Sequence, residues 1–284
     1  KIGFYSNYII NDLQKKVANE IIQQSNLHQY KLFMTNSGAE SNENALQVAS
    51  FYNKREKIIA FKNSFHGRSN AALSITDNSK IKSELNKKID VVHIEFNDKE
   101  RFDKEISEGD VSSVIFESIQ GVGGLDQPST EFVKHISKKC KEYNTCLIAD
   151  EVQSGFGRTG DFFGFQMHQI NPDIICMAKG MGNGFPVGGI LIKDHIKSSF
   201  GMLGSTFGGN HLACSAVLSV LKTIKEESLL TNANEMEIYF KEQISKIKSV
   251  SKVKGRGLML GIEFDFEAAE LRKNLIFKHK IFTG

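Results

Sequence analysis

Short apolar runs that alternate with helical stretches constrain the fold of this chain more than any other feature. The helical stretches include residues 11–24, 40–52 and 131–142. A run at 32–34 indicates a short strand, and longer runs lie at 58–61, 91–94, 113–116, 146–149, 174–177 and 189–192. Strands that alternate with helices predict an α/β protein with a mostly parallel central sheet.

The pattern changes near residue 212. Residues 212–226 and 232–248 predict two long helices, and 258–264 predict a strand. A length of 284 residues is enough for one large and one small domain. We therefore expect a large domain at 1–214, followed at 215–284 by a linking helix and the start of a smaller α+β domain.

Composition narrows the class of protein. The formal charge is +3 and lysines are interspersed with acids, so no basic stripe suggests nucleic-acid binding. No apolar run approaches the ~20 residues that a membrane-spanning helix needs. The four cysteines, Cys140, Cys146, Cys176 and Cys214, have no CxxC spacing, which argues against a metal site. Buried free thiols in a cytoplasmic protein are the expectation.

A candidate anion site follows the strand predicted at 32–34. Ser37 and Glu40 have the spacing of a capping box, which predicts that Ser37 caps a helix. The amides of Gly38 and Ala39 would then point outward at the positive end of that helix, where a phosphate can bind. An ordinary helix start would show the same pattern.

Two further strands end in charged residues. The run at 146–149 leads to Asp150, and the run at 174–177 leads to Lys179, which several glycines follow. In an open α/β sheet, ligands bind at the edge formed by the carboxyl ends of the strands. Asp150 is as consistent with a structural cap as with a binding site, which could hold a metal, a ribose hydroxyl or a cationic ring. A desolvated Lys179 would have a lowered pKa and could act as a nucleophile, although a solvated surface lysine is the simpler alternative.

A phosphate cradle, a carboxylate and an amine at one sheet edge together indicate one ligand. It would carry a phosphate, a basic ring nitrogen and an aldehyde. Pyridoxal phosphate has all three groups. The sequence therefore predicts a pyridoxal-phosphate enzyme with Lys179 and Asp150 as its main cofactor contacts.

The motifs in this chain resemble those of the class III aminotransferases along nearly its whole length. They are NSGAESNE at 36–43, FHGR at 65–68, QG at 120–121, DEVQSGFGRTG at 150–160, AKG at 178–180 and STFGGN at 205–210. The likeness is greatest to the branch that acts on acetylornithine or succinylornithine. It implies a fold-type I homodimer whose active sites lie between the subunits.

The resemblance also implies roles for individual residues. Lys179 would bind the cofactor covalently and move protons, and Asp150 would hold the protonated ring nitrogen. The other implied cofactor contacts are Gly38 and Ala39 at the phosphate, Phe65 and Val152 on the ring faces, Gln153 at the phenolic oxygen and Thr206 from the partner subunit. Arg68, Ser205 and Glu117 would lie on the substrate side, whereas His66 and Arg158 are interpreted as structural.

The expected reaction is transfer of the δ-amine of an N-acylornithine to 2-oxoglutarate, a step of arginine biosynthesis. Ornithine or 4-aminobutyrate would be the alternative substrates. A protein without catalytic activity, a remnant of such an enzyme, is the alternative outside the enzymes. The sequence does not fix the acyl group. Family members usually have Glu where this chain has Val122, and they extend further at both ends.

Overall fold

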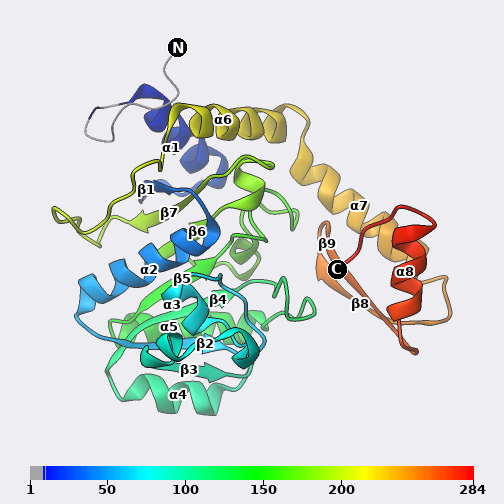
Figure 1. The fold of residues 1–284 in the computed structure, drawn as a ribbon, viewed down its shortest axis with the longest axis horizontal. Coiled ribbons are helices and arrows are strands. Elements are labelled where there is room, and N and C mark those ends of the chain that lie inside the picture. Colours follow the sequence, from blue (N-terminus) through cyan, green and yellow to red (C-terminus); the bar gives the residue numbers. More distant parts are fainter. Residues whose placement is uncertain (1–8, 10) are drawn as a thin grey trace.

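A computed structural model describes residue 9 and residues 11–284 of the chain. Its main element is a seven-stranded sheet with the order β1-β7-β6-β5-β4-β2-β3 (Figure 1). The strands are β1 (Tyr30–Thr35), β2 (Lys57–Phe61), β3 (Val91–Ile94), β4 (Val111–Glu117), β5 (Cys146–Asp150), β6 (Ile174–Met177) and β7 (Gly188–Lys193). The first part of the large domain expected at 1–214, namely residues 1–8 and 10, lies outside the described residues.

The central sheet is mostly parallel, as predicted. Strands β3, β2, β4, β5 and β6 pair in parallel. Strand β7 runs antiparallel to both β6 and β1. Strand β1 therefore points in the same direction as β6, so the carboxyl ends of six strands share one edge.

Helices cover both faces of this sheet. Alternate residues of each central strand belong to two separate hydrophobic clusters, one on each face. The first cluster packs against α1 (Asp12–Ser25), α4 (Lys99–Ser107), α5 (Thr130–Glu142) and α6 (His211–Glu226), and the second against α2 (Gly38–Asn53) and α3 (Asn70–Ile75). The large domain is thus a three-layer α/β/α structure. All four cysteines are free and buried, although the sequence predicted burial for only three of them.

The C-terminal elements lie beside these layers. Figure 1 shows α7 (Leu229–Ile244) leading to the antiparallel hairpin of β8 (Val250–Arg256) and β9 (Met259–Phe264), followed by α8 (Ala269–Phe277). The helix predicted at 232–248 ends four residues early, and β8 and α8 were not predicted. The division expected at residue 215 falls within α6 and stays a prediction.

The hairpin is tied to loops of the large domain. Lys254 Nζ lies 2.8 Å from Asp126 Oδ1, and Arg256 Nη2 lies 3.0 Å from Asp161 Oδ2. These pairs are partly exposed, so we expect each to contribute only modest stability. No helix in the described part of the chain has both the length and the hydrophobicity that crossing a bilayer requires.

Candidate active site

The predicted cofactor residues gather at one edge of the sheet. Gly38 follows β1, Phe65 follows β2, and Lys179 follows β6. Glu117 and Asp150 are the last residues of β4 and β5, where they are register partners. Because these strands all point the same way, their ends form the crevice at which ligands bind in open α/β sheets.

The start of α2 has the geometry that was predicted for an anion site. Ser37 is the N-cap, and its hydroxyl accepts a hydrogen bond from the Glu40 amide at 3.2 Å. The capping box was wrong in one respect, because the Glu40 carboxylate accepts from the Asn36 amide (2.8 Å) and not from Ser37. The first amides of a helix have no partner within it, so those of Gly38 and Ala39 are available to a phosphate.

Gly38 is also required by packing. A Cβ at this position would lie 2.6 Å from Cγ1 of Val152, closer than two carbons can approach. The loop after β5 therefore lies directly against the start of α2. This close approach places Val152, a predicted ring contact, beside the predicted phosphate site.

Asp150 is buried, with 4% of its surface exposed. Its Oδ2 accepts hydrogen bonds from His66 Nδ1 at 2.7 Å and from Asn42 Nδ2 at 2.8 Å. Its Oδ1 accepts from the Val152 amide at 3.0 Å. The interpretation of His66 as a hydrogen-bonded histidine is confirmed, but the sequence did not indicate that its partner would be Asp150.

Glu117 lies beside Asp150 and holds two loops. Its carboxylate oxygens accept from the amides of Phe65 and Gly121, both at 3.1 Å. Burial raises the pKa of Glu117 to about 7; the charge of His66 and the two amides oppose this rise, and the charge of Asp150 adds to it. Glu117 is thus a buried carboxylate that titrates near neutral pH.

Lys179 opens a short 3₁₀ turn, Lys179–Met181, directly after β6. Its Nζ donates to Gln153 Oε1 at 2.7 Å. The expected desolvation is wrong, because Lys179 is exposed and its glycine neighbours have no side chains to cover it. Gln153 is itself fixed by contact with Gly121, where an added Cβ would lie 2.5 Å from the Gln153 amide carbon. The amine is therefore oriented but accessible.

Phe65 and Arg68 form a second pair near this edge. The guanidinium carbon of Arg68 lies 6.0 Å from the centroid of the half-buried Phe65 ring. Arg68 is exposed, and no carboxylate among the described residues forms an ion pair with it. The structure thus shows no sign of the structural ion pair that was an alternative role for this arginine.

Ser205 contacts the start of α2. Its hydroxyl donates to Glu40 Oε1 at 2.9 Å and accepts from Asn36 Nδ2 at 3.1 Å. The neighbouring Thr206 is exposed. These bonds connect the segment at 205–210 to the start of α2. The sequence motifs alone did not indicate this connection.

Glu151 has a structural role that the sequence did not reveal. It is fully buried, and its carboxylate accepts hydrogen bonds from the hydroxyls of Ser118 and Ser154 and from the amides of Gly164 and Phe165. Burial raises the pKa of Glu151 to about 7, although the four hydrogen-bond donors oppose this rise. The residue after Asp150 therefore anchors the loop that follows β5.

Comparisons with known proteins agree with this geometry. The family described as Aminotransferase class-III matches residues 1–280. The chain belongs to the class III aminotransferases. Acetylornithine aminotransferase from Bacillus subtilis is 39% identical over 272 residues, which cover 94% of this chain and 70% of that protein. The protein of the same name from Aquifex aeolicus is 38% identical over 278 residues, or 95% of this chain and 73% of that protein.

Solved structures show the same fold. Ornithine aminotransferase from Toxoplasma gondii superimposes with a TM-score of 0.88 at 25% identity, covering 99% of this chain and 71% of that chain. A taurine:2-oxoglutarate aminotransferase from Bifidobacterium kashiwanohense, solved with PLP and glutamate, has a TM-score of 0.88 at 21% identity, covering 100% of this chain and 75% of that chain. This class III aminotransferase therefore has the fold-type I architecture predicted for it, and its cofactor is pyridoxal phosphate.

The residues at the sheet edge fit that cofactor. Gly38 and Ala39 offer amides to a phosphate, Asp150 offers a carboxylate to a ring nitrogen, and Lys179 offers an exposed amine to an aldehyde. When bound, pyridoxal phosphate supplies an electron sink for chemistry at the carbon that bears the amine.

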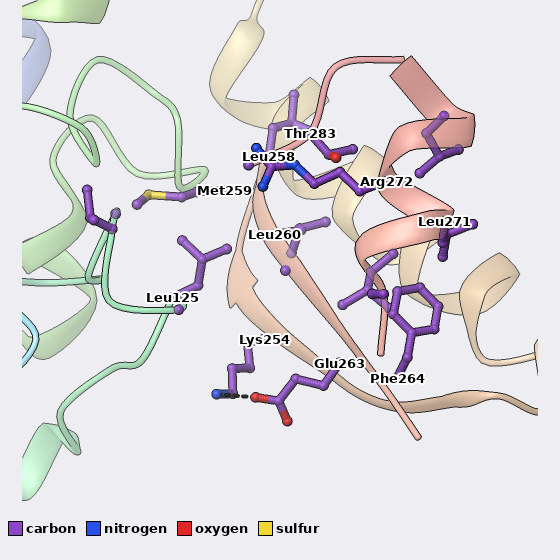
Figure 2. Close-up of a pocket in the computed structure, with 18 of the residues that line it drawn as sticks. Leu125, Lys254, Leu258, Met259, Leu260, Glu263, Phe264, Leu271, Arg272 and Thr283 are labelled. Carbon is purple, nitrogen blue, oxygen red and sulfur yellow. Dashed lines mark ion pairs between the residues drawn. The ribbon is translucent and has the colours of Figure 1, made fainter. Parts of the chain in front are cut away.

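A cavity of about 890 Å³ lies between the large domain and the C-terminal hairpin of this aminotransferase. Figure 2 shows Leu125 on the large-domain side facing Met259 and Leu260 of β9. Gln153 and the exposed Val122 also line it, so the cavity reaches the residue that holds Lys179. Sequence reasoning missed this cavity because its walls are far apart along the chain.

Proposed function

We propose that this class III aminotransferase transfers the δ-amine of an N-acylornithine to 2-oxoglutarate. The products would be an N-acylglutamate 5-semialdehyde and glutamate, which would place the reaction in arginine biosynthesis. The observation that carries the proposal is the identity of 38–39% to acetylornithine aminotransferases over about 94% of the chain. The free, buried cysteines are in keeping with a cytoplasmic location.

The proposed roles of the main residues follow from their surroundings. Lys179 would hold the cofactor through its aldehyde, and its amine, once the substrate amine has displaced it from that carbon, would remove and return the proton on the substrate carbon. Gln153 orients that amine, because it accepts a hydrogen bond from Nζ in this structure. Asp150 binds the ring nitrogen, Phe65 and Val152 cover the ring, and Gly38 and Ala39 bind the phosphate.

The substrate side is proposed from exposure and charge. Arg68 is an exposed guanidinium that can bind a substrate carboxylate in a bidentate manner. Ser205 and Glu117 are proposed to lie beside the substrate. Thr206 is proposed to reach the cofactor phosphate of a partner subunit in a homodimer.

The substrate proposal is tested by comparing kcat/KM for acetylornithine, succinylornithine, ornithine and 4-aminobutyrate with 2-oxoglutarate as acceptor. We expect one of the two acylated ornithines to be used best. A preference for ornithine or 4-aminobutyrate would replace the proposed substrate with that of another family branch. Turnover of none of the four would support a non-catalytic protein.

The role of Lys179 is tested separately. Borohydride reduction of the cofactor-loaded protein followed by peptide mass mapping should mark Lys179. A mark on another lysine would refute the proposed roles even if activity were found.

A further inference from the structure

The carboxylate of Glu40 joins two segments that are far apart in the sequence. Glu40 lies in the first turn of α2, and its partner Ser205 is 165 positions further along the chain. The Ser205 hydroxyl donates to Glu40 Oε1 at 2.9 Å. Asn36 donates to Glu40 Oε2 from its backbone amide at 2.8 Å and from its Nδ2 at 2.9 Å. The carboxylate therefore holds the segment at 205–208 against the start of α2.

These contacts use every hydrogen-bonding site of the Ser205 hydroxyl. A serine hydroxyl has one donor and two acceptor sites. The hydroxyl donates to Glu40, and it accepts from Asn36 Nδ2 at 3.1 Å and from the Gly208 amide at 3.2 Å. The side chains of Asn36, Glu40 and Ser205 thus form a closed ring of three hydrogen bonds. In such a ring, each side chain fixes the orientation of the other two.

The segment is fixed at its other end by close packing. Gly208 is buried, and a Cβ there would overlap the carbonyl oxygen of Met34 in β1. Thr206 and Phe207, which lie between the two fixed ends, are exposed. The contacts of Ser205 and Gly208 therefore determine where the subunit presents Thr206.

Glu40 also belongs to the turn that would bind the phosphate of its own subunit. Its amide donates to Ser37, the N-cap of α2, at 3.2 Å. Gly38 and Ala39, whose amides are available to a phosphate, lie directly before it. One residue thus connects this turn with the segment that carries Thr206.

We propose that Glu40 is a positioning residue for the active site of the partner subunit, because it holds the segment at 205–208 so that Thr206 reaches the cofactor phosphate there. The inference rests on the proposed homodimer with Thr206 at the partner's phosphate, but not on the proposed substrate. Glu40 does not attract the phosphate itself, since a carboxylate near a phosphate repels it. Its contribution is the position of Thr206.

The test compares the affinities of the wild type and Glu40→Gln for pyridoxal phosphate and for pyridoxal, which lacks the phosphate. Glutamine has the size of glutamate, but its amide nitrogen can only donate. That nitrogen would face either the donors of Asn36 or the Ser205 hydroxyl, which already accepts two hydrogen bonds. The preference for pyridoxal phosphate over pyridoxal should therefore fall by about tenfold. The loss of a negative charge would act in the opposite direction.

The matched control is Glu43→Gln. Glu43 is also a half-buried glutamate of α2, and its carboxylate accepts from the backbone amide of Ala72 at 3.1 Å. This variant loses the same charge but should keep the wild-type preference. A general loss of structure would weaken both ligands equally and leave the ratio unchanged. An unchanged or larger preference in Glu40→Gln, or an equal loss in both variants, would overturn the proposal.

Hybrid dimers show on which subunit Glu40 acts. One subunit carries Lys179→Ala, so borohydride can attach the cofactor only to Lys179 of the other subunit. Placing Glu40→Gln on the Lys179→Ala subunit should weaken the binding of reducible pyridoxal phosphate by about tenfold. Placing it on the subunit with the intact Lys179 should have little effect.

The opposite result in the hybrids would refute the proposal, because Glu40 would then act on the phosphate site of its own subunit. A protein that sediments as a monomer would refute the proposed homodimer together with this inference. Neither measurement uses an amino-group donor or acceptor, so both results are independent of the comparison that tests the proposed substrate.

Discussion

Replacing Glu117 by Gln should change how the stability of this protein depends on pH. Burial raises the pKa of Glu117 to about 7, from an ordinary value near 4.5. The folded protein therefore holds a proton on Glu117 over a pH range in which the unfolded chain has lost it. This proton stabilises the fold below pH 4.5, and the stabilisation disappears as pH rises through 7.

The magnitude follows from the difference between the two pKa values. Between pH 5 and pH 8, the titration of Glu117 should lower the free energy of unfolding of the wild type by about 2.5 kcal/mol. A glutamine cannot titrate, so Glu117→Gln lacks this decline. Its amide nitrogen would face the amide of Phe65 or Gly121, so at pH 5, where Glu117 of the wild type is protonated, the variant should be less stable than the wild type by about 1–3 kcal/mol.

The assay is urea unfolding of both proteins at several pH values from 5 to 8. The variant should be clearly less stable than the wild type at pH 5 and should approach or exceed it at pH 8. Glu95→Gln, at an exposed position, is the control and should differ from the wild type by a constant amount. A difference between Glu117→Gln and the wild type that does not vary with pH would refute the reasoning.

Three further substitutions test other parts of the site. Asp150→Asn should lower the turnover rate about a hundredfold or more while keeping some cofactor, and near-normal turnover would exclude the proposed role. Glu151→Gln should lower the free energy of unfolding by about 2–4 kcal/mol, because its amide would face the amide of Gly164 or Phe165; a urea-unfolding loss below about 0.5 kcal/mol would contradict this. Val122→Glu places an acid in the cavity and should change the rate of at least one half-reaction in stopped-flow measurements, whereas two unchanged rates would show that position 122 does not contact substrates.

The sequence predicted the edge of the sheet at which the candidate site lies. Asp150 and Lys179 could be identified because each lies at the end of a short, continuous apolar run that predicts a buried strand. The capping pattern at Ser37 likewise located the start of α2. These signals are local, since each depends on a few consecutive residues.

Contacts between distant residues could not be predicted in the same way. His66 and Asp150 are 84 positions apart, and only the pairing of β2 with β4 and of β4 with β5 brings them together. Strand β8 was missed because it is mostly half-exposed and carries lysines, so it lacks the apolar run of a central strand. The exposure of Lys179 depends on which distant residues cover the end of β6, and a local sequence pattern cannot predict those residues.

The loop at 120–126 connects the hairpin mechanically to the amine of Lys179. At one end, Gly121 fixes Gln153, which binds Lys179. At the other end, Leu125 packs on Gly261 of β9, and Asp126 pairs with Lys254 of β8. The 120–126 loop is therefore one short link between the C-terminal hairpin and the side chain that orients the reactive amine, so a change in the position of the hairpin would be felt at Gln153.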